Sequence, residues 1–322
     1  MATAHRKSTI VRIRLALAAR SVRVAFWVLE RCAPALGARW AERLWFTIPR
    51  ARARRGSGNP RGVPRSIRPG ATGRDGAARL EVAVDGRPVV GRVWGDGEPV
   101  YLLHGWGGSG GQLGAFVAPL LRAGYRVVAF DAPSHGESAP GPGGPRGSTL
   151  LEFAEALRVV VEANGPARAV VAHSLGCSAV AAALRDGLAA YRVVFLAPMA
   201  DPRPYTHQFA RRLGFGERVR ARMVERIERR VGVPMSHFDL PAMARQMTPP
   251  PLLVVHDRDD REIGWSGGRD VSRAWPAARL LLTSGLGHRR ILRDPEVVAQ
   301  VVEFVRSGQQ AAGRPAAAAA GG

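Results

Sequence analysis

The sequence predicts an α/β fold, with a mostly parallel sheet flanked by helices, a helical insertion and a basic helical extension at the N-terminus. Two observations lead to this prediction. From Val100 onward, short apolar runs alternate with segments of helical periodicity, which is typical of a parallel sheet built from strand–helix–strand units. Ahead of that region, two alternating strands flank Asp85 and Gly86, a pair that favours a β-hairpin turn. The chain's 322 residues are enough for one such domain with appendages.

The predicted domain extends from residue 79 to residue 306. Its strands are expected where apolar runs are short and bounded by turn residues, and its helices where apolar residues recur every three or four positions. In chain order, we expect strands at 80–84, 88–94, 100–103, 126–130, 169–172, 192–196, 251–255 and 279–283, and helices at 113–122, 149–164, 175–184 and 295–305. Between two of these strands, residues 199–248 break the alternation with helical segments rich in arginine, methionine and aromatic residues.

The N-terminal region carries much of the positive charge. Residues 1–70 contain sixteen Arg or Lys against two Glu, and the whole chain has a net charge of +21. An anionic partner, either a membrane surface or nucleic acid, would explain this charge. So would coding bias, because the chain is rich in arginine throughout and Lys7 is its only lysine. Arginines interrupt the one long apolar stretch, so neither a spanning helix nor a signal peptide is expected.

Residues 1–50 are predicted to form the helical extension. A first helix over 8–31 has two apolar stripes, and a second over 38–48 interleaves aromatic residues with arginines. This pattern suits peripheral contact with a membrane interface, and it equally suits a helix pair docked on the protein itself. Residues 51–78, rich in Arg, Gly and Pro, are expected to be a linker, and residues 307–322 a disordered tail.

The chain has two cysteines, Cys32 and Cys177, too few for a disulfide framework or a metal-ligand cluster. A reducing compartment is therefore expected, and the prediction is a cytoplasmic protein, with membrane association left open. No pattern in the sequence indicates a metal, a cofactor or a specific nucleic-acid partner.

The predicted domain is organised around Ser174. A short apolar run, residues 169–172, is expected to be a buried strand and residues 175–184 a helix, so that Ser174 falls at their junction. The small residues Ala172 and Gly176 allow a tight turn there. Such a turn exposes one side chain and directs the first amides of the helix at the group that it attacks. The stretch resembles the nucleophile elbow of the α/β-hydrolases, G-x-S-x-G, with alanine in place of the first glycine.

Three further motifs follow the order and spacing of that family. They are H-G-W-G-G-S at 104–109, D-A-P-S-H-G-E-S at 131–138, and the pair D-R-D-D at 257–260 with G-L-G-H at 285–288. Together with the elbow, these motifs make residues 79–306 similar to an α/β-hydrolase domain. The resemblance implies that the insertion, at about 199–248, is the helical lid of that domain.

The resemblance also implies a catalytic triad in the family's order of serine, acid and histidine. A serine hydroxyl is a weak nucleophile at neutral pH and needs a base, which a carboxylate in turn orients. Ser174 is the expected nucleophile and His288 the expected base. Asp260 occupies the family's acid position, while Asp257, which stands where the family has glycine, and Asp259 remain alternatives.

Two backbone amides are expected to stabilise the oxyanion. One is the amide of Leu175, directly after the nucleophile, and the other is that of Trp106, in the H-G-x motif. His135 belongs to a turn that is expected to hold loops near the site rather than to supply the base. The glycine-rich stretch 104–109 lacks the G-K-[ST] ending and the spacing of a phosphate-binding loop.

The implied enzyme is a serine hydrolase that cleaves a small-molecule carboxylic ester or thioester through an acyl-enzyme. Serine at position 174 argues against epoxide hydrolase and dehalogenase chemistry, for which the family uses aspartate. An acyltransferase or a carbon–carbon bond hydrolase on the same triad remains an alternative. A third hypothesis is a non-catalytic, membrane-associated binding protein led by the basic residues 1–50.

Overall fold

The computed structural model describes residues 19–49 and 76–307. Most of the predicted linker and nearly all of the predicted tail lie outside the described residues. The chain divides into two compact units. The first, here called the helical unit, consists of Met1–Thr47 and Asp201–Asp239; the second, the sheet unit, consists of Ile48–Ala200 and Leu240–Gly322.

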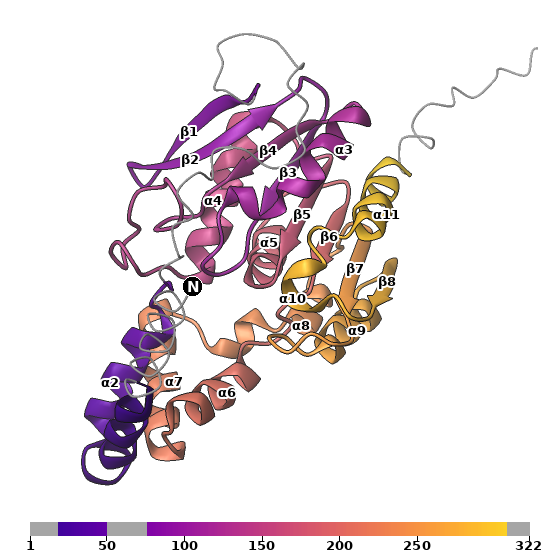
Figure 1. The fold of residues 1–322 in the computed structure, drawn as a ribbon. Coiled ribbons are helices and arrows are strands. Elements are labelled where there is room, and N and C mark those ends of the chain that lie inside the picture. The colour runs from indigo at the N-terminus through magenta and orange to yellow at the C-terminus, as the bar shows by residue number, and fades with distance from the viewer. Residues whose placement is uncertain (1–18, 50–75, 308–322) are drawn as a thin grey trace, which may run out of the picture. The chain divides into compact units, whose positions relative to one another are not determined.

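The sheet unit is built on an eight-stranded sheet of order β1-β2-β4-β3-β5-β6-β7-β8 (Figure 1). The strands are β1 (Ala78–Val84), β2 (Arg87–Trp94), β3 (Pro99–Leu103), β4 (Arg126–Phe130), β5 (Ala169–His173), β6 (Val193–Leu196), β7 (Leu252–Asp257) and β8 (Ala278–Thr283). The hairpin β1–β2 is antiparallel and β2 pairs antiparallel with β4, whereas every later pairing is parallel. The predicted mostly parallel sheet is confirmed.

The local sequence explains both parts of this sheet. Strands β3, β5, β6 and β7 are buried at every residue, which is why they are continuous apolar runs rather than alternating ones. In the β1–β2 turn, Asp85 and Gly86 have φ values of 48° and 72°. Two consecutive positive φ values match the twist of a tight hairpin, and Asp-Gly adopts them readily.

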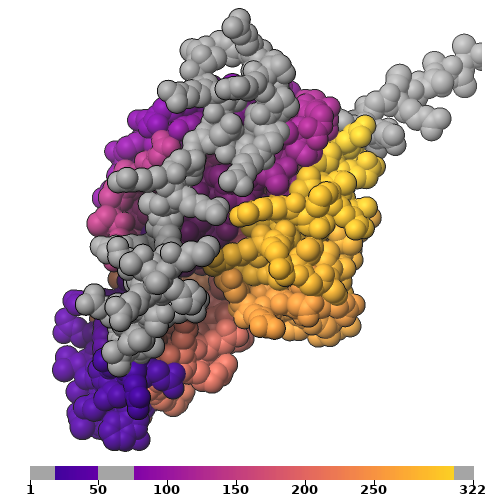
Figure 2. Space-filling model, in the orientation of Figure 1, coloured from indigo at the N-terminus to yellow at the C-terminus, as the bar shows by residue number. Residues whose placement is uncertain are grey.

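Helices cover both faces of the sheet. They are η1 (Gly110–Phe116), α3 (Val117–Arg122), α4 (Leu150–Asn164), α5 (Leu175–Arg185), α8 (Leu240–Ala244), α9 (Trp265–Ala274), α10 (Gly287–Arg290) and α11 (Pro295–Arg306). One core joins alternate strand residues, such as Val100 and Leu102, to Phe116, Leu120 and Phe304. Figure 2 shows the yellow surface of α11 beside the magenta surface that includes α3, and α11 also contacts η1. Helices α4 and α5 pack together and do not contribute to that core.

The helical unit contains a helix over residues 19–32, α2 (Pro34–Trp45), α6 (Arg203–Leu213), α7 (Glu217–Val231) and η2 (Met235–Phe238). Helix α2 begins at Pro34 rather than at the predicted residue 38, because proline fits the first turn of a helix. Its aromatic residues, which suggested a membrane interface, face inward: Phe46 is buried, and Trp40 and Trp45 pack against the same core. The two N-terminal helices therefore pack as a pair against the inserted helices.

Charged side chains tie the N-terminal helices to α6 and α7. Both oxygens of Glu30 accept hydrogen bonds from the first amides of α7, those of Gly216, Arg218 and Val219, at 2.9–3.1 Å. A carboxylate at a helix N-terminus satisfies unpaired amides and opposes the helix dipole. The guanidinium of Arg23 donates to two carbonyls at the C-terminus of α6, where positive charge is favourable. Two ends of the inserted helices are thus capped by the N-terminal extension.

Candidate active site

Ser174 lies between β5 and α5 in an unusual backbone conformation. Its φ and ψ are 53° and −119°, outside the regions that side chains other than glycine normally adopt. Such a conformation persists only where the surrounding structure enforces it, and it is typical of functional sites. Gly176 helps to enforce it, because a Cβ there would lie 2.6 Å from the carbonyl oxygen of His104. Ala172 is fully buried, so its methyl group fits where the family has its first glycine.

The loop after β3 passes beside the nucleophile. A Cβ on Gly105 would lie 3.0 Å from Cβ of Ser174, which shows how closely the two backbones approach. Among the described residues, the amide of Trp106 has no hydrogen-bond acceptor. The amide of Leu175 is the first of α5, where helix geometry leaves amides unpaired. These are the two donors that the sequence predicts for an oxyanion.

Two buried histidines hold that loop. Nε2 of His104 accepts the amide hydrogen of Ala132 at 3.0 Å, and Nε2 of His135 accepts that of Gly107 at 3.1 Å. Burial lowers the pKa of both imidazoles to about 4, so both are neutral at pH 7 and free to act as acceptors. Trp106 packs edge-on against His135. His135 therefore positions the loop, as the sequence predicts for its motif.

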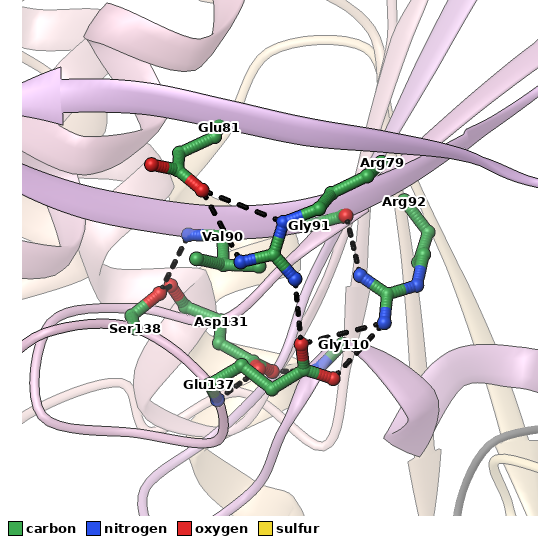
Figure 3. A network of polar contacts seen from close by, with 9 residues as sticks. All are labelled: Arg79, Glu81, Val90, Gly91, Arg92, Gly110, Asp131, Glu137 and Ser138. Atoms are coloured by element: carbon green, nitrogen blue, oxygen red, sulfur yellow. Dashed lines mark hydrogen bonds and ion pairs between the residues drawn. The ribbon is translucent and has the colours of Figure 1, made fainter. Parts of the chain in front are cut away.

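Asp131, directly after β4, links the region after β3 to the sheet. One of its oxygens accepts the amide of Gly110 at 2.6 Å and the other that of Glu137 at 2.7 Å (Figure 3). Ser138 completes the link, because its hydroxyl donates to the Asp131 carbonyl and accepts the amide of Val90 in β2. Figure 3 also shows the exposed arginines of β1 and β2 reaching the Glu137 carboxylate.

His288 follows β8, in the short helix α10. Its Nδ1 lies 2.7 Å from Oδ2 of Asp260, and both side chains are buried. Burial alone would raise the pKa of Asp260, but hydrogen bonds from His256, His288 and the amide of Ile263 outweigh it and hold that pKa below its usual range. Asp260 is therefore ionised at neutral pH and orients the imidazole.

The other two candidate acids bind the loop that carries His288. Asp257 accepts hydrogen bonds from the Thr283 hydroxyl at 2.7 Å and from the Leu286 amide at 3.0 Å. Asp259 accepts one from the Gly285 amide at 2.7 Å. Of the three candidate acids, the one hydrogen-bonded to His288 is Asp260.

Two further histidines adjoin the pair, and the sequence analysis did not single them out. The ring of His173 lies 4.5 Å from that of His288, and its Nε2 lies 3.1 Å from the His288 carbonyl oxygen. Burial lowers the pKa of His173 to about 3. Nε2 of His256 lies 3.1 Å from the Ile263 carbonyl oxygen and 3.5 Å from Oδ2 of Asp260. His173 directly precedes Ser174, and that position is the one signal that could have identified it.

His173, the residue before the predicted nucleophile, packs against the predicted base, His288. Ser174 and His288, both described, share no hydrogen bond in this structure. Such a bond is often long in a free enzyme and shortens when substrate binds. Within residues 19–49 and 76–307, no group of three or more His, Cys, Asp or Glu side chains is placed to hold a metal ion.

Comparison with known proteins assigns the family. The model of the "Alpha/beta hydrolase family" matches residues 100–301, more than half of the chain. A serine hydrolase-like protein of Danio rerio is 35% identical over 107 residues, which are 33% of this chain and 32% of that protein. This chain thus matches about a third of the length of that curated relative.

Solved structures share the fold. An esterase from Rhodococcus sp. ECU1013 has a TM-score of 0.52 and 22% identity, with 72% of this chain and 98% of that chain covered. A monoacylglycerol lipase from Paleococcus ferrophilus has a TM-score of 0.52 and 22% identity, with 68% and 98% covered. With the matching family model, the eight-stranded sheet and the motifs, the chain belongs to the alpha/beta hydrolase family.

Proposed function

We propose that this hydrolase uses Ser174, His288 and Asp260 to cleave a small-molecule carboxylic ester or thioester. The observation that carries the proposal is the buried hydrogen bond of 2.7 Å between His288 and Asp260, and the strained strand-to-helix turn at Ser174 supports it. A nucleophile, a base and a residue that orients the base are the parts that acyl transfer requires.

In the first half of the reaction, Oγ of Ser174 attacks the acyl carbon while Nε2 of His288 takes the hydroxyl proton. Asp260 holds Nδ1 of His288 and stabilises the imidazolium. The oxygen of the tetrahedral intermediate becomes negative and is stabilised by the amides of Trp106 and Leu175. Collapse of the intermediate breaks the bond to the alcohol or thiol, which leaves with the proton from His288.

In the second half, water attacks the acyl-enzyme with His288 again as the base. The carboxylic acid is released and Ser174 recovers its proton. The names of the relatives support this choice of chemistry, since they include a serine hydrolase-like protein, an esterase and a monoacylglycerol lipase.

The test is hydrolysis of p-nitrophenyl esters of increasing acyl length by wild type and Ser174→Ala. We expect turnover by the wild type and a loss of at least about 10³-fold in kcat/KM in the variant, because removing a nucleophile removes the covalent path. Ser272→Ala, a change in α9, is the control and should keep full activity. A fluorophosphonate probe should label the wild type and not Ser174→Ala.

Three outcomes would contradict the proposal. Full activity of Ser174→Ala would exclude Ser174 as the nucleophile. Labelling of Ser174 without turnover of any ester would exclude ester hydrolysis and favour an acyltransferase or a carbon–carbon bond hydrolase. Failure of the probe to label the purified wild type would favour the non-catalytic binding protein.

A further inference from the structure

The N-terminal helices expose an unusual group of apolar side chains. Of the described residues, five large hydrophobic ones are exposed, and four of them lie within thirteen positions of one another. They are Val24, Trp27, Val28 and Leu36, with exposed fractions of 57%, 54%, 43% and 58%. The fifth is Tyr191, in the sheet unit. Apolar residues scattered singly on a surface need no explanation, but such a group indicates a binding surface.

These residues share their helix faces with arginines. In the helix over 19–32, positions 20, 24, 27, 28 and 31 repeat at helical spacing and are all exposed. In α2, positions 36, 39 and 43 also recur at helical spacing and are exposed. We call these residues the outer face; its members are Arg20, Val24, Trp27, Val28, Arg31, Leu36, Arg39 and Arg43. The opposite sides of both helices pack in the core of the helical unit, through Phe26, Ala38 and Ala41.

The outer face is positive and contains no carboxylate. The two acidic residues of these helices are both engaged with α7: Glu30 caps its N-terminus and Glu42, which is buried, pairs with Arg226 at 2.6 Å. Over its described residues, the helical unit contains 14 arginines against 7 Asp or Glu. Excess positive charge therefore accompanies the exposed apolar group.

We propose that the outer face docks on the surface of an anionic lipid bilayer. Tryptophan favours the boundary between lipid headgroups and acyl chains, where its apolar ring is buried and its N–H stays hydrated. The Arg31 guanidinium already lies 3.8 Å above the Trp27 ring, so both groups would enter the interface together. The valines and the leucine would bury apolar surface, and the arginines would pair with lipid phosphates.

Charge complementarity favours an anionic bilayer over two other possible partners of this face, a second copy of the chain and a nucleic acid. A second copy of the chain seated on the same face would bring its arginines opposite these arginines, with no carboxylate to pair them. A nucleic acid would satisfy the arginines and leave three exposed aliphatic side chains without apolar contact. An anionic bilayer offers negative charge and an apolar layer in the same few ångströms.

The first test is co-sedimentation of the full chain with vesicles of phosphatidylcholine, with and without phosphatidylglycerol. We expect binding to the anionic vesicles, weakened by salt because the attraction is screened. Trp27→Ser with Val28→Ser should lower the partition coefficient about tenfold, the effect of withdrawing apolar side chains from an interface. Arg39→Gln with Arg43→Gln should lower it on anionic vesicles. Tyr191→Ser, which removes the exposed aromatic residue outside the outer face, is the matched control and should bind as wild type does.

Cys32 supplies a second, local measurement. It is exposed at the end of the helix over residues 19–32, whereas Cys177, the other cysteine, is buried and its thiol pKa is raised by burial. A thiol-reactive, environment-sensitive dye should therefore label Cys32 in the folded chain. We expect its emission to shift to shorter wavelength on addition of anionic vesicles and to stay unchanged with phosphatidylcholine alone.

Three results would overturn the proposal. One is absence of both sedimentation and the emission shift with anionic vesicles. Another is vesicle binding that survives all four outer-face substitutions, which would assign it to basic residues elsewhere in the chain. The last is a stable dimer or a nucleic-acid complex that the same substitutions abolish, because either would identify a different occupant. Ser174-dependent esterase activity is measured separately, so this proposal and the proposed function fail independently.

Discussion

At the scale of single residues, three carboxylates within four positions have separate tasks. Asp260 binds the imidazole of His288, whereas Asp257 and Asp259 bind the backbone of the loop on which that imidazole is carried. The family pattern predicts Asp260 as the acid but does not predict what Asp257 and Asp259 bind. Their hydrogen-bond partners depend on where the loop after β8 lies, and a run of adjacent acidic residues does not determine the position of that loop.

We expect Asp257→Ala to lower kcat of the proposed esterase about tenfold or more with little change in KM. The variant removes the acceptor for the Thr283 hydroxyl and the Leu286 amide, and small displacements of a catalytic group are costly. Asp257→Asn retains one side-chain oxygen as acceptor and should restore part of kcat. Asp270→Ala, a change of an exposed carboxylate in α9, is the control. Unchanged kcat in Asp257→Ala would show that the loop is held by other contacts.

At the scale of helices and strands, the sequence predicted the sheet unit far better than the helical unit. Each strand from β3 to β8 is a local apolar run, and its position is visible in the chain itself. For the N-terminal helices, the sequence is compatible with a membrane partner and with a protein partner, because aromatic residues beside arginines suit both. Their partner is α7, which is far away in sequence: a Cβ on Gly37 would contact Val219. No local pattern reveals such a pairing.

In the N-terminal helices, the exposed apolar residues are not those that the membrane-interface hypothesis uses. Trp40, Trp45 and Phe46, on which the interface hypothesis rested, belong to the core of the helical unit. The exposed residues are instead Trp27 and its aliphatic neighbours on the preceding helix. The part of the predicted first helix before residue 19 lies outside the described residues; of the members of its two apolar stripes that are described, Val22 packs against the core, whereas Val24 and Val28 are exposed.

Glu30 is expected to contribute measurably to the stability of the helical unit. Its carboxylate accepts three amide hydrogens at the N-terminus of α7, an arrangement that charge and capping geometry both favour. Glu30→Gln should therefore reduce the free energy of unfolding by about 1–2 kcal/mol. Glu225→Gln, an exposed position in the same helix, provides the comparison. Urea denaturation followed by circular dichroism measures both, and equal stability of the two variants would refute the capping role.

At the scale of the whole molecule, distant parts of the chain combine into two units. From the sequence, residues 1–50 are predicted to be an extension and 199–248 an insertion in the domain. The extension is predicted from its helical periodicity and charge, and the insertion from a break in the strand–helix alternation. Neither signal indicates which distant segment it packs against. Contacts join the described residues 19–47 with 201–239, whereas α8, also within the predicted insertion, belongs to the sheet unit. Among the described residues, no helix is long and apolar enough to cross a bilayer.

Buried neutral histidines make the sheet unit sensitive to acid. Burial lowers the pKa of His104 and His135 to about 4 and that of His173 to about 3, against about 6.5 in an unfolded chain. Between about pH 6.5 and pH 4, the unfolded chain therefore binds protons that the folded chain does not. Their contribution to stability is complete above about pH 6.5 and is lost as the pH falls through this window.

The free energy of unfolding should accordingly fall on acidification from pH 7, and His135→Gln should reduce the slope. Each such histidine contributes up to about 1.4 kcal/mol per pH unit, and glutamine can still accept the Gly107 amide without titrating. Urea midpoints from about pH 7 to pH 4.5 measure the slope. His207→Gln, an exposed position in α6, should leave it unchanged. Equal slopes in wild type and His135→Gln would mean that His135 binds its proton in the folded chain, in which case it could not accept the Gly107 amide and other contacts would hold the loop after β3.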